Sequence, residues 1–454
     1  MDIRDYIKQN RERFFEELFS LIRIPSVSAH LQSQPEMQKC AECWKKLLLE
    51  AGVDKADILS TDGNPVVFAS KFVDKNYPTI LVYGHYDVMP AEPLELWKSA
   101  AFEPEIRNGK IYARGADDDK GQSFIHAKAF EYLVNTNQLR CNVKFLLEGE
   151  EEIGSPNLEK FCEENKELLS CDTILVSDTS MLSEETPSIT TGLRGLAYWQ
   201  IEVTSASRDL HSGLFGGAVA NPIIELSKII AQLVDNDGKI TIPHFYDNVE
   251  AVSPEEKELI AQTPFNEEAY KKSLDIKDIF GEKGYSTIER IGTRPALDVC
   301  GIWGGYTGEG SKTVLPSKAY AKLSARLVPK QTPEKISELV ATHIKKIAPD
   351  YIGIEVSWLH GAQAYVCPID SDFYKAAEKA YQKVYGKRPL PVRSGGSIGV
   401  IPVFEKVLKV KSILMGFGLE SDAIHSPNES FPVKQFEKGI ETVVAFYQEI
   451  GTSR

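Results

Sequence analysis

The fold is decided by the stretch Leu81-Val82-Tyr83-Gly84-His85-Tyr86-Asp87-Val88, in which an apolar run ends in two residue types that bind metals. The apolar run is typical of a β-strand, and side chains two residues apart on a strand point to the same side. His85 and Asp87 are therefore expected to project together from the strand end. Taken alone, such a pair is more often structural than functional, so support must come from elsewhere in the chain.

Acidic clusters follow other apolar segments in the same way. They are Asp117-Asp118-Asp119, Glu150-Glu151-Glu152 and Asp178, and a late histidine, His425, supplies a second imidazole. Each cluster alone is compatible with a solvated turn or with a helix start. Carboxylates crowded at the ends of buried strands repel one another unless a cation neutralises them. Their recurrence therefore predicts a metal site with two ions.

Composition and charge disfavour several classes of function. The chain of 454 residues is too long for one ordinary core, and the prior of about 150 residues per domain predicts two or three domains. A net charge of −13 disfavours a phosphate-binding surface, because nucleic-acid binders need clustered Lys and Arg. No run approaches the ~18 apolar residues of a membrane span. We expect a small-molecule partner, no nucleic acid and no membrane.

The N-terminus and the cysteines favour a cytoplasmic location. The opening Met1-Asp2-Ile3-Arg4-Asp5-Tyr6-Ile7-Lys8 carries charges where a signal peptide would have an apolar core. The seven cysteines are scattered and odd in number, unlike a disulfide framework. Cys40 and Cys43 form a C-x-x-C pair, but residues 36–49 resemble a helix without a second pair nearby, which favours structural cysteines.

Strand and helix patterns alternate through the first part of the chain. Apolar residues at helical spacing predict a helix over residues 7–22. Strands are expected at residues 66–72, 79–83, 143–147 and 173–176, with helices at 123–133 and 157–169. This alternation predicts an α/β domain with a mixed, largely parallel sheet and helices on both faces, in which ligands gather beyond the carboxyl ends of the strands. The residues expected there are His85, Asp87, Glu151, Glu152 and Asp178.

The middle of the chain has a different pattern. Strands predicted at residues 197–204, 319–327 and 352–358 alternate apolar and polar residues, as in an antiparallel sheet with one wet face. Helices are expected at residues 222–234 and 333–347, and a polar, charged stretch covers residues 249–283. After this, the α/β pattern returns, with helices at residues 373–385 and 433–450 and a strand at 412–417.

The position of His425 implies a discontinuous domain. If His425 completes a site with His85, the middle of the chain must be an insertion. We therefore expect residues 1–190 and 367–454 to form one domain, and residues 191–366 to form an inserted α+β domain.

A hydrolytic two-metal site needs ligands that hold two cations about 3.5–4 Å apart, with a position left open for water. Two histidines, a bridging carboxylate and two terminal carboxylates suffice. Of two adjacent glutamates, one can bind metal while its neighbour takes a proton from the attacking water. Asp87, two residues beyond His85, can hydrogen-bond the imidazole and orient it.

Together these motifs resemble the M20 family of metallopeptidases, and in particular its dipeptidase branch, which includes carnosinases and cytosolic nonspecific dipeptidases. The family's first two signatures match Gly84-His85-Tyr86-Asp87-Val88 and Arg114-Gly115-Ala116-Asp117-Asp118-Asp119-Lys120-Gly121. The resemblance extends over nearly the whole chain, from Ile24-Pro25-Ser26-Val27-Ser28 to His425-Ser426-Pro427-Asn428-Glu429. It implies a di-metal catalytic domain, an inserted lid and dimerisation domain, and a homodimer.

The resemblance also implies roles for the candidate residues. The implied metal ligands are His85 and Asp178 for one ion, Glu152 and His425 for the other, and Asp118 bridging both. Asp87 would orient His85, and Glu151 would be the general base. The spacing between Arg114-Gly115 and Lys120-Gly121 favours Asp118 over Asp117 and Asp119 as the bridge, and the Asp118–Asp119 peptide bond is expected to be cis. Glu150 stands where the dipeptidases often carry a different residue.

Further residues of the inserted domain match substrate-contacting positions. Asp209-Leu210-His211-Ser212-Gly213 is similar to a motif whose histidine reaches the partner subunit's active site and stabilises the oxyanion. Ser324-Ala325-Arg326-Leu327-Val328-Pro329 is similar to a segment whose arginine holds the substrate carboxylate, a role suited to a planar bidentate donor. Thr313 and Ser397, the latter in the loop Gly395-Gly396-Ser397, also match substrate-contacting positions.

The implied activity is hydrolysis of the peptide bond of a dipeptide or very short peptide, with a water activated by the metals and deprotonated by Glu151. Two alternatives stay open at this point. One is a deacylase that cleaves N-acetyl or N-succinyl amino acids at the same metal site, and the other is a non-catalytic binding protein. The mixed ligand set accepts zinc, which we expect, or manganese.

Overall fold

The protein divides into two compact units in the computed structural model, which describes residues 1–396 and 398–452. The first unit contains Met1–Thr191, Cys367–Val392 and the described residues from Ile398 onward. The second unit contains Gly192–Val366 and the short segment that begins at Arg393. The first unit is therefore discontinuous in sequence, because the chain leaves it after Thr191 and returns at Cys367.

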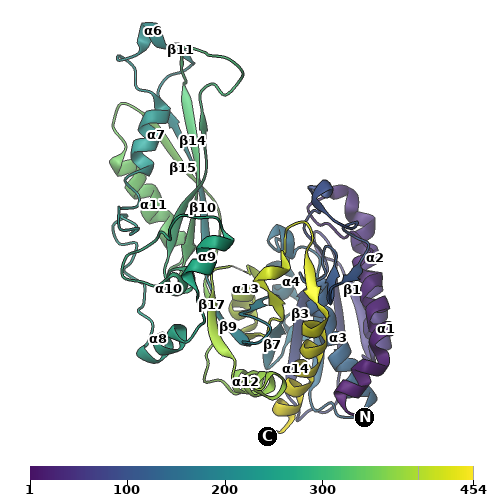
Figure 1. The fold of residues 1–454 in the computed structure, drawn as a ribbon. Coiled ribbons are helices and arrows are strands. Elements are labelled where there is room, and N and C mark those ends of the chain that lie inside the picture. Colours follow the sequence, from purple (N-terminus) through teal and green to yellow (C-terminus); the bar gives the residue numbers. More distant parts are fainter. Residues whose placement is uncertain (397, 453–454) are drawn as a thin grey trace. The chain divides into compact units, whose positions relative to one another are not determined.

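A mixed sheet forms the centre of the first unit (Figure 1). Its strands follow the order β1 (Lys55–Leu59), β2 (Val66–Lys71), β6 (Asn142–Glu148), β3 (Thr79–His85), β7 (Thr173–Val176), β18 (Ser412–Leu414) and β9 (Ser188–Leu193), and β17 (Leu390–Ser394) also pairs with β9. The last residues of β9, Gly192 and Leu193, belong to the second unit, where they pair with β16 (Tyr365–Val366). The four strands from β6 to β18 run parallel, whereas β1, β2 and β9 are antiparallel to their neighbours. The carboxyl ends of β6, β3 and β7 therefore meet at one edge of the sheet.

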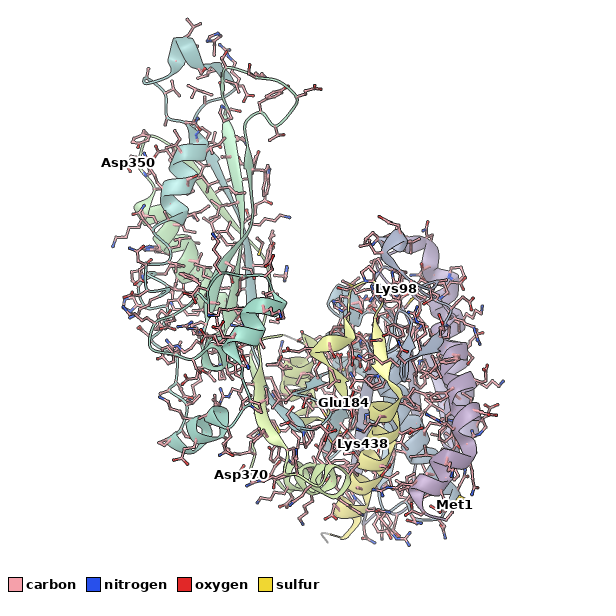
Figure 2. The ribbon with its side chains drawn as sticks, in the orientation of Figure 1. Met1, Lys98, Glu184, Asp350, Asp370 and Lys438 are labelled. Atoms are coloured by element: carbon pink, nitrogen blue, oxygen red, sulfur yellow. The ribbon has the colours of Figure 1, made fainter. Side chains whose placement is uncertain are left out.

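Helices cover both faces of this sheet, as the sequence predicts. The helices are α1 (Ile3–Ile22), α2 (Gln34–Ala51), α3 (Lys120–Asn135), α4 (Leu158–Glu164), α5 (Lys166–Leu169), α12 (Asp372–Tyr385), α13 (Val400–Leu408) and α14 (Val433–Thr452). Helix α3 contacts β3 and is surrounded by α1, α2 and α14, while α13 contacts α4, α5 and β18. Figure 1 shows the α13 and α4 group on the opposite side of the strands from α3 and α14. Their side chains fill the space between helices and sheet (Figure 2).

Short strands complete the first unit. They are β4 (Glu105–Arg107), β5 (Lys110–Tyr112) and β20 (Ser430–Pro432) in one small sheet, and β8 (Ser180–Met181) with β19 (Gly418–Leu419) in another. The pairing of β20 with β5 joins the C-terminal part of the chain to the segment that precedes Arg114.

The second unit is built on a four-stranded antiparallel sheet of order β12 (Ala296–Gly304), β14 (Lys318–Leu327), β10 (Gly195–Thr204) and β15 (Gly353–Ala362). Buried and partly exposed residues alternate along β10, as the sequence pattern predicts. The helices α7 (Pro222–Ile230) and α11 (Pro333–Ile347) contact this sheet, and their apolar residues share one core with it. The remaining elements are β11 (Leu210–His211), α6 (Ser212–Phe215), α8 (Pro254–Ala261), α9 (Glu267–Ser273), α10 (Thr287–Gly292) and β13 (Val314–Leu315).

The structure differs from the predicted elements at several boundaries. The helix expected over residues 157–169 is interrupted at Asn165, which separates α4 from α5. The helix expected over 222–234 ends at Ile230, because Val234 instead pairs with Ile240 in a β-bridge. The polar stretch over 249–283 contains α8 and α9. Within the described part of the chain, no helix combines the length and the apolar character that crossing a membrane requires.

A buried ion network joins α1 to α3. Lys128 is 2% exposed and lies 2.6 Å from the carboxylate of Glu131, which is 5% exposed. Lys128 also pairs with Glu17, and Arg13 pairs with both glutamates. The Tyr6 hydroxyl donates a 2.7 Å hydrogen bond to Glu131. Because charges removed from water are costly when unpaired, each partner of this network depends on the others.

Replacing Glu131 by Gln should lower the free energy of unfolding by about 3 kcal/mol, because the buried Lys128 would lose the buried one of its two carboxylate partners. Urea unfolding of the metal-free protein measures this change. The matched control is Glu50→Gln, which removes an exposed pair with Lys46 and should cost less than about 0.5 kcal/mol. Equal effects of the two substitutions would contradict the assigned role of the network.

Candidate metal centre

A first group of possible metal ligands lies at the carboxyl edge of the parallel strands in the first unit. His85 ends β3, Asp178 follows β7, and Asp118 lies in the loop before α3. One ligand atom from each of these residues lies within 4.8 Å of the others. Nε2 of His85 is 3.1 Å from Oδ1 of Asp118. The parallel arrangement of the strands thus gathers residues that are far apart in the sequence.

A second group consists of Asp118, Glu152 and His425. Nε2 of His425 lies 2.9 Å from Oδ2 of Asp118 and 3.0 Å from Oε2 of Glu152. Asp118 is therefore common to both groups, with one carboxylate oxygen toward His85 and the other toward His425. This geometry is the one that a carboxylate bridging two cations requires.

The other two acids of the Asp117-Asp118-Asp119 cluster make different contacts. Oδ2 of Asp119 accepts hydrogen bonds from the Ser123 hydroxyl at 2.5 Å and from the N–H of His85 at 3.2 Å. Asp117 is 1% exposed and belongs to neither ligand group. The peptide bond between Asp118 and Asp119 is cis. Among the three, Asp118 alone belongs to the candidate ligand groups that the described residues form.

Asp87 links His85 to the Glu151-Glu152 segment. Nδ1 of His85 lies 3.0 Å from the Asp87 carbonyl oxygen and 3.3 Å from its carboxylate. The same carboxylate accepts hydrogen bonds from the backbone N–H of Glu151 at 3.2 Å and of Glu152 at 3.1 Å. Asp87 is fully buried, so these bonds are shielded from water. It therefore contacts the imidazole and fixes the backbone of both glutamates.

The three consecutive glutamates have three different surroundings. The carboxylate of Glu150 accepts hydrogen bonds from the N–H of Asn64 at 3.0 Å and from the amide of Asn157 at 2.8 Å. Glu152 belongs to the second ligand group. Glu151 belongs to neither of the two groups that the described residues form. The structure thus places Glu150 in loop contacts and Glu152 in a candidate ligand group, and it leaves Glu151 outside both groups.

The buried carboxylates of the site would be stabilised by a bound cation. Burial, together with the charge of Asp118, raises the pKa of Asp178 well above its usual value. Burial and the neighbouring acids also raise the pKa of Glu151 to about 8. Hydrogen bonds to Asp118 and Glu152 raise the pKa of His425 to about 10. In the absence of cations, the site therefore holds protons that divalent ions would displace, and its oxygen and imidazole donors suit zinc or manganese.

The other predicted residues belong to the second unit. His211 is exposed on β11, where its Nδ1 accepts a 3.0 Å hydrogen bond from the N–H of Gly213. The Thr313 carbonyl accepts a 3.1 Å hydrogen bond from the N–H of Ser212, so His211 and Thr313 lie in adjacent segments. Arg326 is on β14, opposite Leu196 on β10. Ser397 lies outside the described residues.

Two buried acids at this edge carry no sequence prediction. Glu148, at the end of β6, accepts hydrogen bonds from the hydroxyls of Tyr83 at 2.5 Å and Ser155 at 2.9 Å, and burial raises its pKa to about 8. Glu429 is fully buried and accepts from Arg114 Nη1 at 2.8 Å. The sequence signals for them are the position of Glu148 two residues before the Glu150-Glu151-Glu152 cluster and that of Glu429 in the matched His425-Ser426-Pro427-Asn428-Glu429 motif.

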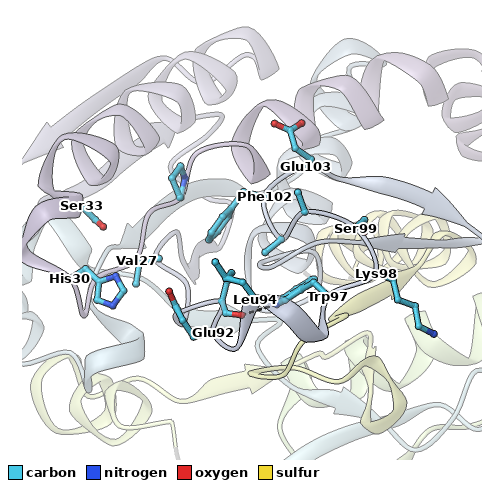
Figure 3. A pocket seen from close by; sticks show the side chains of 14 residues that line it. Val27, His30, Ser33, Glu92, Leu94, Trp97, Lys98, Ser99, Phe102 and Glu103 are labelled. Carbon is cyan, nitrogen blue, oxygen red and sulfur yellow. Dashed lines mark hydrogen bonds between the residues drawn. The ribbon is translucent and has the colours of Figure 1, made fainter.

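A pocket of about 680 Å³ in the first unit is lined mainly by loop residues (Figure 3). Its lining includes the apolar side chains of Val27, Leu94 and Phe102. Trp97 donates a 2.7 Å hydrogen bond from Nε1 to the carbonyl of Ala91 at this pocket. None of the residues in the two ligand groups lines it, so the metal centre remains the candidate site.

Sequence comparisons agree with the geometry. The sequence profile of peptidase family M20/M25/M40 matches residues 81–449. The chain is 32% identical to the Cys-Gly metallodipeptidase of Schizosaccharomyces pombe over 464 residues, which cover 99% of this chain and 98% of the relative. It is 31% identical to the human Beta-Ala-His dipeptidase over 467 residues, covering 98% of this chain and 91% of the relative.

A solved structure shows the same likeness in three dimensions. An M20 family metallo-carboxypeptidase from Sulfolobus solfataricus superposes with a TM-score of 0.87 at 34% identity. The match covers 96% of this chain and 99% of that structure. The profile match, the near full-length relatives and the fold agree. The chain belongs to peptidase family M20/M25/M40.

Proposed function

We propose that the protein is a metal-dependent dipeptidase that hydrolyses the peptide bond of dipeptides or very short peptides. The observation that carries the proposal is the pair of ligand groups that share Asp118, since a shared carboxylate is the mark of a two-ion hydrolytic centre. The named activities of the relatives support the substrate class, because two of them at 31–32% identity are dipeptidases.

The residues of the first unit divide into ligands and a proton carrier. His85 and Asp178 would hold one ion, Glu152 and His425 the other, and Asp118 both. Two divalent ions at these ligands would polarise the scissile carbonyl and lower the pKa of the attacking water. Glu151 takes the proton from that water and passes it to the leaving amine. Asp87 orients the imidazole of His85 and the backbone of Glu151 through the bonds described above.

We assign substrate contacts to the second unit. Arg326 would bind the free carboxylate of the substrate through its planar guanidinium. His211 of a second copy would stabilise the oxyanion, which makes residues 191–366 a lid and dimerisation domain and the enzyme a homodimer. Thr313 and Ser397 would contact the substrate, and residues 1–190 and 367–454 would form the catalytic domain. We infer a cytoplasmic location from the seven cysteines, which are odd in number and scattered along the chain.

A deacylase and a carboxypeptidase differ from the proposed dipeptidase in the substrates that they accept. A deacylase would use the same metal ligands on N-acyl amino acids, but the relatives compared above are named as peptidases. A carboxypeptidase would accept peptides whose N-terminus is blocked, whereas a dipeptidase requires a free amine. The distinction between a carboxypeptidase and a dipeptidase has to be tested because the Sulfolobus relative is named as a carboxypeptidase.

We expect metal-stripped protein to regain peptidase activity with Zn²⁺ or Mn²⁺ and to prefer free dipeptides. Initial rates should be measured on a dipeptide panel that includes Cys-Gly and β-Ala-His, beside N-blocked dipeptides, N-acetyl and N-succinyl amino acids. Preference for N-blocked dipeptides would indicate a carboxypeptidase, and preference for acyl amino acids a deacylase. Absence of turnover on every substrate with either metal would overturn the proposed activity.

Replacing Glu151 by Gln should lower kcat by at least about 100-fold while both ions stay bound, because a general base typically contributes 10²–10⁴-fold. Turnover and metal content by elemental analysis are measured on the same preparation. The matched control is Glu150→Gln, since Glu150 is adjacent but belongs to neither ligand group and should change kcat only several-fold. Comparable activity of Glu151→Gln and wild type would contradict the assignment.

The metal-free protein should lose stability as the pH rises from about 5 to 8.5. Glu151 has a pKa raised to about 8, so the folded state is favoured by its proton, and this stabilisation is lost as pH rises from about 4.3, the usual value for Glu, through 8. His425 acts in the same direction, because its pKa is raised to about 10 and the stabilisation by its charge is lost above about 6.5.

Thermal unfolding at several pH values tests this expectation. The Tm of the metal-free protein should fall with rising pH, and added Mn²⁺ should raise Tm more at pH 8.5 than at pH 5.5, because its ligands must be deprotonated. A Tm that rises with pH over this range in the metal-free protein would contradict the described electrostatics.

A further inference from the structure

Glu429 is a buried carboxylate beside the candidate metal centre to which the proposed mechanism gives no role. Its side chain is fully buried and accepts four hydrogen bonds from one loop. Oε2 accepts from Arg114 Nη1 at 2.8 Å and from the N–H of Gly115 at 3.0 Å. Oε1 accepts from the N–H of Asp117 at 3.0 Å and of Asp118 at 3.1 Å. An ionised carboxylate can only accept, and about four lone-pair sites are available, so these donors saturate it.

These bonds set the position of Asp118. One of them is made by the backbone N–H of Asp118 itself, and the others hold the residues immediately before it. The side chain of Asp118 has to meet His85 at 3.1 Å and His425 at 2.9 Å at the same time. A small rotation of its backbone would remove one oxygen from one of the two ligand groups. Glu429 therefore acts on the bridge through the backbone.

Glu429 also holds the segment that carries His425 against the Asp118 loop. The Glu429 carbonyl accepts a 3.2 Å hydrogen bond from the N–H of Ala113, so backbone and side chain both bind the Asp118 loop. Asn428 adds hydrogen bonds with the N–H of Lys98 and the carbonyl of Leu96, each 2.8 Å. The His425 side chain is 46% exposed, so packing of the ring constrains it little. Its position depends on how the segment is fastened.

The negative charge of Glu429 is neutralised by the guanidinium of Arg114 and needs no metal ion. Arg114 is fully buried and pairs with Glu429, and its other amino group donates to the carbonyl of Pro90 at 3.1 Å. The guanidinium also lies 5.6 Å from the centre of the Trp97 ring. Glu429 belongs to neither candidate ligand group. Its bonds are consequently complete without an ion.

We propose that Glu429 is a positioning residue that fixes Asp118 and His425 relative to one another before any ion binds, so that the second ion site is preformed. The inference rests on the proposed two-ion centre. Glu429 would act by hydrogen-bonding the loop that carries a ligand, and substitutions of such partners typically weaken metal affinity about 10–100-fold.

The test is the substitution Glu429→Gln. The glutamine amide keeps one oxygen that can accept hydrogen bonds, but its NH₂ group would face N–H groups that also donate. In a Mn²⁺ titration followed by calorimetry and metal content, we expect two equivalents for the wild type. We expect the second equivalent to bind at least about tenfold more weakly in the variant, with kcat reduced more than KM is changed. The matched control is Glu289→Gln, because Glu289 is 8% exposed and accepts a 2.8 Å hydrogen bond from the N–H of Ser286 in the second unit. This control should bind both equivalents as the wild type does.

The outcomes separate this inference from the proposed function. Two equivalents bound with equal affinity by wild type and Glu429→Gln would overturn the role of Glu429 and leave the two-ion centre intact. Uptake of fewer than two equivalents by the wild type would overturn both.

A second measurement on the metal-free wild type does not depend on the variant's folding. Hydrogen–deuterium exchange should show the amides of Gly115, Asp117 and Asp118 protected without any ion, because Glu429 accepts from all three. Fast exchange that slows only when Mn²⁺ is added would show that the metal, and not Glu429, orders the loop.

Discussion

The structure depends on one electrostatic constraint, which is that the carboxylate of Asp118 faces two ligand groups at once. One oxygen lies beside His85 and the other beside His425, while Asp178 and Glu152 bring further negative charge to either side. Burial makes this arrangement unfavourable for bare carboxylates, as the raised pKa values of Asp178 and Glu151 record. Divalent cations are the groups that would compensate it, and they would turn the same crowding into a hydrolytic centre.

The first unit supplies this arrangement by topology. The strands β3 and β7 run parallel, so His85 and Asp178 reach the same edge of the sheet from segments far apart in the sequence. Glu152 arrives after the neighbouring parallel strand β6, held by the carboxylate of Asp87. The last ligand, His425, comes from the C-terminal part of the chain, after the return at Cys367. Long-range hydrogen bonds, including those of Glu429, hold that segment against the Asp118 loop.

Much of this arrangement can be predicted from the sequence, because the ends of short apolar strands can be recognised in it. His85 and Asp178 each follow a short apolar run, and parallel strands must place such residues together. The edge strand β1 was not predicted, since Lys55–Leu59 has a mixed pattern with little burial. Strand β12 was missed because its residues are mostly exposed and its register shifts between Val299 and Gly301. The family resemblance, and not the pattern alone, distinguished Glu151 from Glu150.

The buried position of Glu429 could not be predicted from the sequence. Its partners are mainly backbone N–H groups, which every residue except proline carries, so no side-chain pattern points to them. A glutamate after a histidine motif is compatible with a surface position, and only the fold reveals that this one is buried against Arg114. Likewise, the loop contacts of Glu150 with Asn64 and Asn157 depend on segments that the sequence keeps apart.

The most direct test of the two-ion centre is a crystal structure of the Mn²⁺-loaded protein, with anomalous scattering measured at the manganese absorption edge. Two anomalous peaks about 3.5–4 Å apart are expected. One peak should lie between His85 and Asp178, the other between Glu152 and His425, and Asp118 should touch both. A single peak, or two peaks that do not share Asp118, would contradict the central claim that this carboxylate bridges two ions.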